Sequence, residues 1–264
     1  MIKKLFEPIK IGPVNVPNRV VMTAMHLNYT PNGEISDQFI NFYEARAAGG
    51  AGLIIVGGAE INDQAAGIDL MLAIKDDKYI PGLKKFTDRI HQYETKVVVQ
   101  LYMAGAYSFC GLKGLPILAP SEFTSYFTRQ KTTAMTLEDI YRVQQDFVES
   151  TRRAREAGFD AVEVLGSAGY LICQFLSPKT NRRDDEYGGP LENRMRFGLE
   201  TVSKVRKAAG PDMAVLVRVA GNDFVPGSHT NTESKVFAAE VEKAGADCIN
   251  VTGGWHESRV PQIT

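Results

Sequence analysis

Residues Val162–Phe197 read VEVLGSAGYLICQFLSPKTNRRDDEYGGPLENRMRF. The apolar run at the start, Ala161–Leu165, predicts a buried strand. A loop punctuated by glycines follows and presents Tyr170, and a helix is predicted to begin at Leu191. A phenol on a loop after a strand is held by rigid structure yet open to a substrate, which suits catalysis. A packed tyrosine is the alternative interpretation.

The same unit of strand, polar loop and amphipathic helix recurs on both sides of this stretch. The predicted strands are Val20–Met25, Leu53–Val56, Val97–Leu101, Ala161–Leu165, Val215–Val219 and Cys248–Val251. The predicted helices are Asp37–Ala48, Ile80–Gln92, Leu137–Ala157, Leu191–Ala209 and Glu233–Ala244. Apolar strands joined by helices indicate a parallel sheet that is covered on its outside.

Units of this length predict a TIM (β/α)₈ barrel, here truncated after its sixth strand. We therefore expect residues 1–264 to form one incomplete N-terminal barrel domain, part of a longer protein. A small hairpin is predicted at Pro8–Asn18, before the first strand. The long segment Ala104–Met135 has two equally weighted interpretations, a lid or binding element and a plain insertion.

The composition predicts a globular protein with 44% apolar residues, 23% charged residues and a net charge of −1. This balance gives no reason to expect nucleic acid or a membrane as a partner. The cysteines Cys110, Cys173 and Cys248 are far apart and in no metal-ligand spacing, so we expect no metal site and a cytoplasmic protein with reduced thiols. A homo-oligomer is compatible with this composition.

The spaced pattern GY-LxxQFLSPxxNxRxDxYGGxxxNRxRF, which begins at Gly169, resembles the old yellow enzyme family of flavin-dependent ene-reductases. The resemblance implies FMN as cofactor and NADH or NADPH as electron donor. The ending Ala24-Met25-His26 of the first strand is most similar to the 2,4-dienoyl-CoA reductase branch. Full-length proteins of that branch also carry a 4Fe-4S cluster and FAD, for which this chain has neither the cysteine group nor the Gly-x-Gly-x-x-Gly motif.

Two polar residues lie within predicted strands that are otherwise apolar and expected to be buried. Gln100 must find hydrogen-bond partners, because an unpaired buried amide costs roughly 1–3 kcal/mol. Arg218 is a permanent cation that needs an anion. The resemblance implies that both residues bind the flavin ring. The alternatives are a structural network around Gln100 and an ion pair of Arg218 with Glu163.

The resemblance also places residues of the first two strands against the flavin. His26 on its own is more commonly a structural histidine, and Gly57-Gly58 is more commonly a tight turn, although glycine lets a flat ring approach the backbone. The loops after strands seven and eight, which commonly hold a barrel's cofactor phosphate, are not in this chain, so we expect it to bind FMN weakly by itself. The cofactor residues implied by the resemblance are Ala24, Met25, His26, Gly58, Gln100 and Arg218.

Tyr170 and His256 are the predicted catalytic pair. A phenol stays protonated at neutral pH and can protonate a developing carbanion. His256 follows two glycines after the sixth strand, where the same branch has a histidine that assists the tyrosine. Many family members carry a polar pair at the positions of Leu165 and Ala168, and both residues are apolar here. Simple enones are therefore in doubt as substrates.

The predicted reaction is reduction of a C=C bond conjugated to a thioester or carboxylate, most like that of 2,4-dienoyl-CoA reductase. Rival substrates within the branch are an enoate, an unsaturated bile-acid-type compound and an aryl-CoA. A non-catalytic barrel fragment without flavin is a rival from another class. A phosphate-binding aldolase or isomerase would need a Schiff-base lysine or paired acids at the ends of strands, and Lys96 stands at the start of one.

Overall fold

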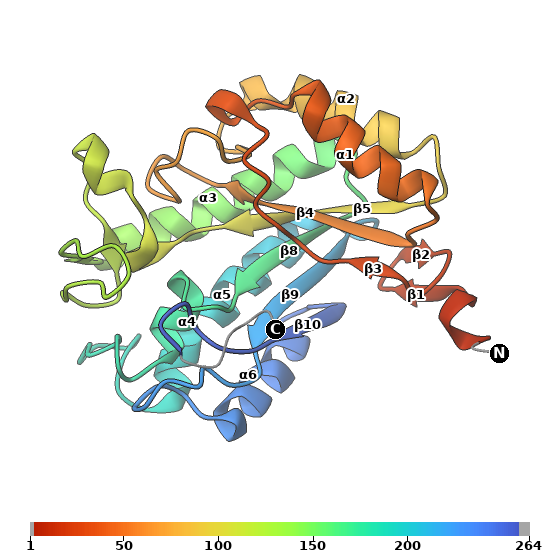
Figure 1. The fold of residues 1–264 in the computed structure, drawn as a ribbon. Coiled ribbons are helices and arrows are strands. Elements are labelled where there is room, and N and C mark those ends of the chain that lie inside the picture. Colours follow the sequence, from red (N-terminus) through yellow and green to blue (C-terminus); the bar gives the residue numbers. More distant parts are fainter. Residues whose placement is uncertain (1–2, 259–264) are drawn as a thin grey trace.

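Six parallel strands form the central sheet of the computed structural model, which describes residues 3–258. Their order in the sheet is β10-β9-β8-β5-β4-β3, and the sheet curls into a half-barrel (Figure 1). The predicted truncated (β/α)₈ architecture is thus confirmed. The strands are β3 (Val21–Met22), β4 (Leu53–Glu60), β5 (Lys96–Tyr102), β8 (Ala161–Gly166), β9 (Ala214–Ala220) and β10 (Cys248–Thr252).

All five predicted helices form and cover the outer face of the sheet (Figure 1). Capping boxes at Thr136 and Thr230 start α3 and α6, because each threonine accepts a hydrogen bond from the third backbone amide of its helix. The cap at Thr230 explains why α6 begins two residues before the predicted Glu233. A short helix, α4, was not predicted. The helices are α1 (Asp37–Ala48), α2 (Ile80–Ile90), α3 (Leu137–Glu156), α4 (Leu171–Leu176), α5 (Leu191–Ala209) and α6 (Asn231–Lys243).

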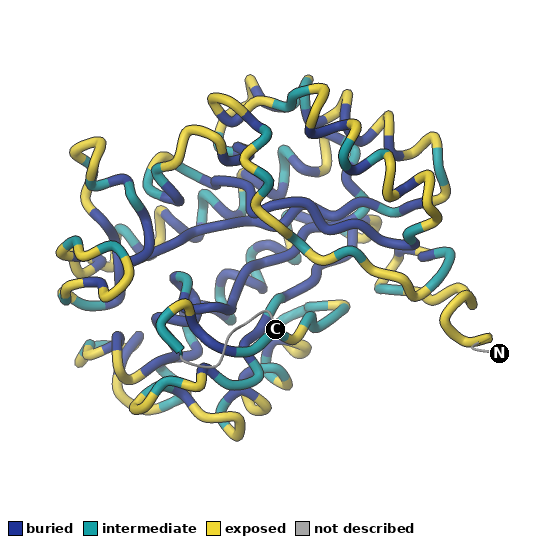
Figure 2. The backbone as a smooth tube through the Cα atoms, in the orientation of Figure 1, coloured by how far each residue is buried: buried dark blue, intermediate teal, exposed yellow. Residues whose placement is uncertain are grey.

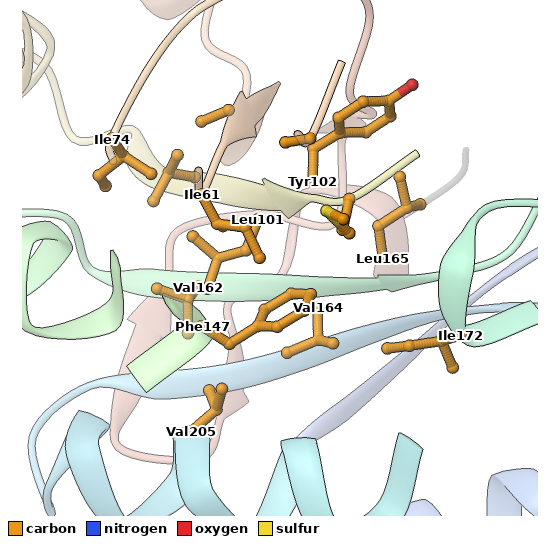
Figure 3. Packing of buried hydrophobic residues seen from close by; sticks show 14 of the residues in the cluster. Ile61, Ile74, Leu101, Tyr102, Phe147, Val162, Val164, Leu165, Ile172 and Val205 are labelled. Atoms are coloured by element: carbon orange, nitrogen blue, oxygen red, sulfur yellow. The ribbon is translucent and has the colours of Figure 1, made fainter. Parts of the chain in front are cut away.

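The main hydrophobic core lies between these helices and the sheet (Figure 3). Alternate residues of each strand face it, such as Leu101 of β5 and Val162 and Val164 of β8. Phe147 of α3 and Val205 of α5 pack against these strands from the helix side. Burial of both faces makes the strands almost wholly apolar, which is the pattern that predicted them.

A second, smaller core lies on the inner face of the half-barrel. The predicted hairpin is confirmed as β1 (Ile9–Ile11) and β2 (Val14–Val16), and its valines are buried in this core. The remaining buried residues of this core come from the strands and are Leu53, Ile55, Val98, Ala161, Ala214 and Leu216. The hairpin therefore fills the amino-terminal end of the half-barrel and leaves the carboxyl ends of the strands open.

The predicted first strand, Val20–Met25, is too long. Only Val21 and Met22 pair with β4, opposite Leu53 and Ile54. β3 is an edge strand with one neighbour among residues 3–258, so no second ladder holds the chain extended beyond Met22. The edges of the sheet are less buried than the strands between them (Figure 2). Val21 of β3 is 44% exposed and Val251 of β10 is 66% exposed.

The segment Ala104–Met135 is ordered around short elements and has no long helix or strand. These are two 3-10 turns, η4 (Gly105–Tyr107) and η5 (Cys110–Lys113), and the paired strands β6 (Leu118–Ala119) and β7 (Thr133–Ala134). Three further 3-10 turns lie elsewhere, at η1 (Lys4–Phe6), η2 (Pro31–Gly33) and η3 (Asp77–Tyr79). No helix within residues 3–258 is long and apolar enough to cross a membrane.

Candidate active site

The loop after β8 presents Tyr170 at the open end of the half-barrel. Gln174 of α4 fixes this loop, because its Nε2 donates to the Gly169 carbonyl at 2.6 Å and its Oε1 accepts from the Ala106 amide at 3.0 Å. Gly169 has φ +81°, and a Cβ there would lie 2.9 Å from the ring of Trp255. Glycine is therefore required both for the turn and for the close approach of the indole.

Tyr170 and His256 are brought together at this end of the sheet. The Tyr170 hydroxyl lies 3.2 Å from His256 Nε2, and His256 Nδ1 lies 2.8 Å from the carbonyl oxygen of Ala168. Since a carbonyl only accepts, Nδ1 carries the ring's proton and Nε2 accepts from the tyrosine. Burial lowers the pKa of His256, although the Ala168 carbonyl and the nearby Glu257 act in the opposite direction. The neutral ring is thus favoured at neutral pH.

A second phenol, Tyr102, was not predicted to be part of the site. It ends β5 two residues after Gln100, and since side chains alternate along a strand, both face the inside of the half-barrel. Its ring meets that of Tyr170 edge to face, with centroids 4.8 Å apart. Burial raises the pKa of Tyr170, and a hydrogen bond from Tyr102 and the charge of Arg218 offset part of this increase. Tyr170 therefore stays protonated at neutral pH.

A layer of polar side chains crosses the inside of the half-barrel below the two tyrosines. Gln100 Nε2 donates to Glu163 Oε1 at 2.6 Å, and Asn250 Nδ2 donates to Glu163 Oε2 at 2.8 Å. Burial raises the pKa of Glu163, and these two donors and the charge of Arg218 only partly offset it. The structural network around Gln100 is therefore present. Asn250 was missed, although a polar residue inside the apolar run of β10 is the same signal that singled out Gln100 and Arg218.

Arg218 is half-buried on β9 and forms no salt bridge with a carboxylate among residues 3–258. In particular, the alternative ion pair with Glu163 is not formed as a direct contact. Across the sheet Arg218 lies opposite Leu165 of β8 and Asn250 of β10. Its charge acts on Glu163 and Tyr170 through space and offsets a small part of the increase that burial causes in the pKa of both groups.

The residues after β3 lie at the other side of the opening. The Gly58 amide donates to His26 Nδ1 at 3.2 Å, and the His26 ring meets Tyr102 edge to face at 5.1 Å. Desolvation and the nearby His256 lower the pKa of His26, so this ring is neutral and keeps its proton on Nε2. Ala24 packs partly against the inner core, whereas the side chain of Met25 is 45% exposed.

The long segment Ala104–Met135 reaches the site. Tyr107 and Phe127 surround the His256 ring, with centroid separations of 5.3 Å and 5.6 Å. The Tyr107 hydroxyl donates to Glu257 Oε1 at 3.0 Å, which ties this segment to the loop that carries His256. The segment thus builds an aromatic wall beside the predicted catalytic pair. A plain insertion distant from the site is not what the structure shows.

Residues 4–264 match the family described as NADH:flavin oxidoreductase / NADH oxidase. This chain belongs to that family. Among solved structures it is similar to an old yellow enzyme from Pichia sp. AKU4542, with a TM-score of 0.84 and 27% identity over 94% of this chain and 70% of that one. The resemblance to the old yellow enzyme family is therefore confirmed.

Two further relatives of this NADH:flavin oxidoreductase family are much longer than the chain. A metal reductase of Desulforamulus reducens is 53% identical over 98% of this chain and 39% of the relative. A 2-naphthoyl-CoA reductase in complex with 2-naphthoyl-CoA matches with a TM-score of 0.94 and 31% identity, over 98% of this chain and 42% of that one. The chain thus spans about two fifths of the length of both proteins.

Two apolar positions at the end of β8 and in the loop after it, Leu165 and Ala168, are both buried. Leu165 is 5% exposed and Ala168 is 7% exposed. Because both side chains are apolar, neither can form a hydrogen bond to a ligand in the opening. Ala168 instead contributes its backbone carbonyl, which orients His256. Polar side chains around the opening therefore come from other positions, among them Tyr170 and His256.

Proposed function

We propose that this chain forms the catalytic barrel of an FMN-dependent ene-reductase, which uses NADH or NADPH as electron donor. The observation that most supports this proposal is the hydrogen bond between the Tyr170 hydroxyl and His256 Nε2, which is 3.2 Å long. In this pair a neutral imidazole orients a phenol whose pKa is raised. The substrate we propose is an alkene conjugated to a thioester or carboxylate. A 2,4-dienoyl-CoA reductase-like activity is its most specific form.

Two polar groups support a flavin ring at this site. Gln100 gives its Nε2 to Glu163, so its Oε1 is left as an acceptor that matches the N–H of the flavin's pyrimidine ring. Arg218, without a salt bridge among residues 3–258, matches the negative charge of the reduced ring near N1 and O2. The other residues proposed to lie against the ring are Ala24, Met25, His26 and Gly58.

When bound, the flavin supplies a hydride to one carbon of the alkene. Tyr170 donates its phenolic proton to the neighbouring carbon, where negative charge develops. The hydrogen bond from Tyr102 and the charge of Arg218 favour the resulting phenolate, since both offset part of the increase that burial causes in the pKa of Tyr170. The His256 ring is partly desolvated by its aromatic neighbours, but the residue keeps an exposed surface, so it can take up a solvent proton at Nε2 and pass it to the phenolate.

The lining of the site supports an acyl thioester or carboxylate more than a simple enone. Leu165 and Ala168 provide no side-chain donor for a carbonyl oxygen, so a substrate needs its own activating group and contacts elsewhere. The similar 2-naphthoyl-CoA reductase was solved with an acyl-CoA ligand. The alternative substrates are an enoate, an unsaturated bile-acid-type compound and an aryl-CoA thioester.

The test is the substitution Tyr170→Phe in the flavin-loaded protein. We expect the rate of alkene reduction to fall by roughly 10²–10⁴-fold, the range of a lost general acid. Flavin reduction by NADH or NADPH should be unchanged, because no proton from Tyr170 is needed there. Unchanged turnover at saturating alkene would remove Tyr170 from the mechanism.

A second candidate function is electron transfer from the flavin to a metal acceptor. It is favoured by the 53% identity to a metal reductase. Electron transfer to such an acceptor needs no proton at carbon, so Tyr170→Phe should leave it intact. Turnover of Tyr170→Phe with ferric citrate and with an enoyl thioester, measured side by side, separates the two functions.

A further inference from the structure

Three buried side chains from distant parts of the sequence meet behind the Tyr170 loop. Cys173 comes from α4, Asp223 from the loop after β9, and His229 from the loop before α6. One ligand atom from each lies within 4.8 Å of the other two. Their exposed fractions are 0% for Cys173, 0% for Asp223 and 3% for His229. The cluster is therefore closed to bulk water.

We propose that Cys173, Asp223 and His229 bind a divalent transition-metal ion. Sulfur, carboxylate oxygen and imidazole nitrogen together are the donors that zinc takes in proteins. Cys173 Sγ lies 3.3 Å from Asp223 Oδ1, and His229 Nδ1 lies 2.7 Å from Asp223 Oδ2. Nothing in this inference depends on the flavin or on the proposed alkene substrate.

The buried carboxylate of Asp223 lacks a lysine or arginine partner among residues 3–258. A buried carboxylate needs a cation beside it, and no lysine or arginine within residues 3–258 forms a salt bridge with Asp223. Among the described residues, the basic side chain paired with Asp223 is that of His229. However, its Nδ1 has no hydrogen-bond partner among the described residues, although Asp223 Oδ2 is only 2.7 Å away. An imidazolium paired with this carboxylate would aim its N–H at the oxygen, whereas a shared metal ion requires no such alignment.

Neighbouring side chains donate hydrogen bonds to the proposed ligands. The indole Nε1 of Trp255 donates to Cys173 Sγ at 3.1 Å, as it would to a metal-bound thiolate. Ser228 Oγ donates to Asp223 Oδ2 and lies 2.7 Å from Ser177 Oγ, so the carboxylate is oriented from outside. Such hydrogen bonds to ligands are typical of metal sites.

Binding of a divalent cation would leave this buried pocket without net charge. Without metal, Cys173 Sγ donates to Asp223 Oδ1 at 3.3 Å and is therefore a thiol. On loading, the S–H bond breaks, a proton leaves to solvent and a sulfur–metal bond forms. Thiolate, carboxylate and divalent cation then sum to zero, with His229 neutral.

The proposed ion would brace the loops that carry the predicted catalytic pair. Trp255 directly precedes His256, and its indole is held both by Cys173 and by the close approach of Gly169, which precedes Tyr170. An ion bound to Cys173 therefore connects α4, the loop after β9 and the loop after β10. We assign it a structural role.

Cobalt(II) is a suitable probe, because thiolate ligation gives it a charge-transfer absorption band in the near ultraviolet. The protein, stripped with a chelator and freed of flavin so that its absorption does not interfere, is titrated with Co²⁺. We expect one equivalent to bind with a thiolate band, zinc to abolish this band by replacing cobalt, and zinc to raise the melting temperature. Cys173→Ser should lose the band. Cys110→Ser, which changes a buried cysteine outside the cluster, should keep it.

Several results would overturn the proposal. If the wild-type protein binds no stoichiometric Co²⁺, the cluster is an Asp223–His229 ion pair only. A thiolate band that persists in Cys173→Ser would place the metal elsewhere. If Cys173→Ser does not fold, His229→Gln and the wild-type melting temperature with and without chelator decide the matter. A melting temperature that does not respond to metal removal or to added zinc would contradict the structural role.

Discussion

The hydroxyl of Tyr170 lies 3.2 Å from Nε2 of His256, although the two residues are 86 positions apart in the chain. Tyr170 follows β8 and His256 follows β10, and β9 lies between these strands in the sheet. Parallel strands end at the same edge of a sheet, so loops from non-adjacent strands can meet above the strand between them. The order of the strands in the sheet thus brings the two residues of the predicted catalytic pair together.

The exposure of His256 predicts chemical rescue. His256→Ala should lower alkene turnover by roughly 10²-fold, because Tyr170 loses the group that returns its proton. Imidazole added to the solvent should restore part of this rate, since the truncated side chain leaves an accessible space beside the phenol. The measurement is steady-state alkene reduction with increasing imidazole. The double variant Tyr170→Phe/His256→Ala is the control and should not respond. Absence of rescue in the single variant would make His256 a packing residue.

Arg218 is expected to stabilise the anionic form of the reduced flavin. Arg218→Leu in the flavin-loaded protein should lower the reduction potential of the flavin or its occupancy, because the cation without a salt bridge is removed. Arg218→Lys keeps the charge and should retain most of the potential. Spectroelectrochemistry and flavin content after gel filtration measure the two effects. Wild-type potential and occupancy in Arg218→Leu would leave the arginine a purely structural role.

Glu163 should give this protein a pH dependence of stability opposite to that of an ordinary paired carboxylate. Its pKa in the folded state is raised above the ordinary value of 4.5, chiefly by burial. A raised folded pKa means that its contribution to stability is complete below 4.5 and is lost as the pH rises through the folded pKa. The free energy of unfolding of the wild type minus that of Glu163→Gln should therefore increase as the pH falls from neutral toward 4.5.

Urea denaturation of both proteins at several pH values measures this difference, which cancels the titration of all other groups. Glu44→Gln is a control, because hydrogen bonding to Arg89 lowers the pKa of Glu44 and its contribution should change in the opposite direction. A pH-independent difference for Glu163→Gln would show that burial does not govern this carboxylate.

Phe147 tests the core between α3 and the sheet. Its side chain is 1% exposed, and Phe147→Ala should destabilise the protein by about 3–5 kcal/mol, the cost of lost burial plus a cavity. Tyr141→Ala, on the same helix, is the matched control, because Tyr141 is 61% exposed and should cost far less. Chemical denaturation of both variants gives the comparison. Similar losses for the two would mean that α3 is not anchored by this face.

The sequence alone determined the fold class and most of the element order. Apolar runs and amphipathic periodicity act over a few residues, so strands such as Ala161–Leu165 and helices such as α3, which begins at the predicted Leu137, could be predicted. The spaced motif at Tyr170 was sufficient to indicate the family. The first strand was predicted too long, because pairing of β3 depends on neighbours and not on its own residues.

Only the tertiary structure decided which side chains meet. Glu163 receives Gln100 and Asn250, and Tyr102 reaches Tyr170, because strand register and the curl of the sheet bring inward-facing positions together. Cys173, Asp223 and His229 have no ligand spacing in the sequence, yet three separate loops and helices place them in one buried cluster. Local patterns carry the information for elements, whereas contacts between distant residues depend on how those elements pack, which no short stretch of sequence encodes by itself.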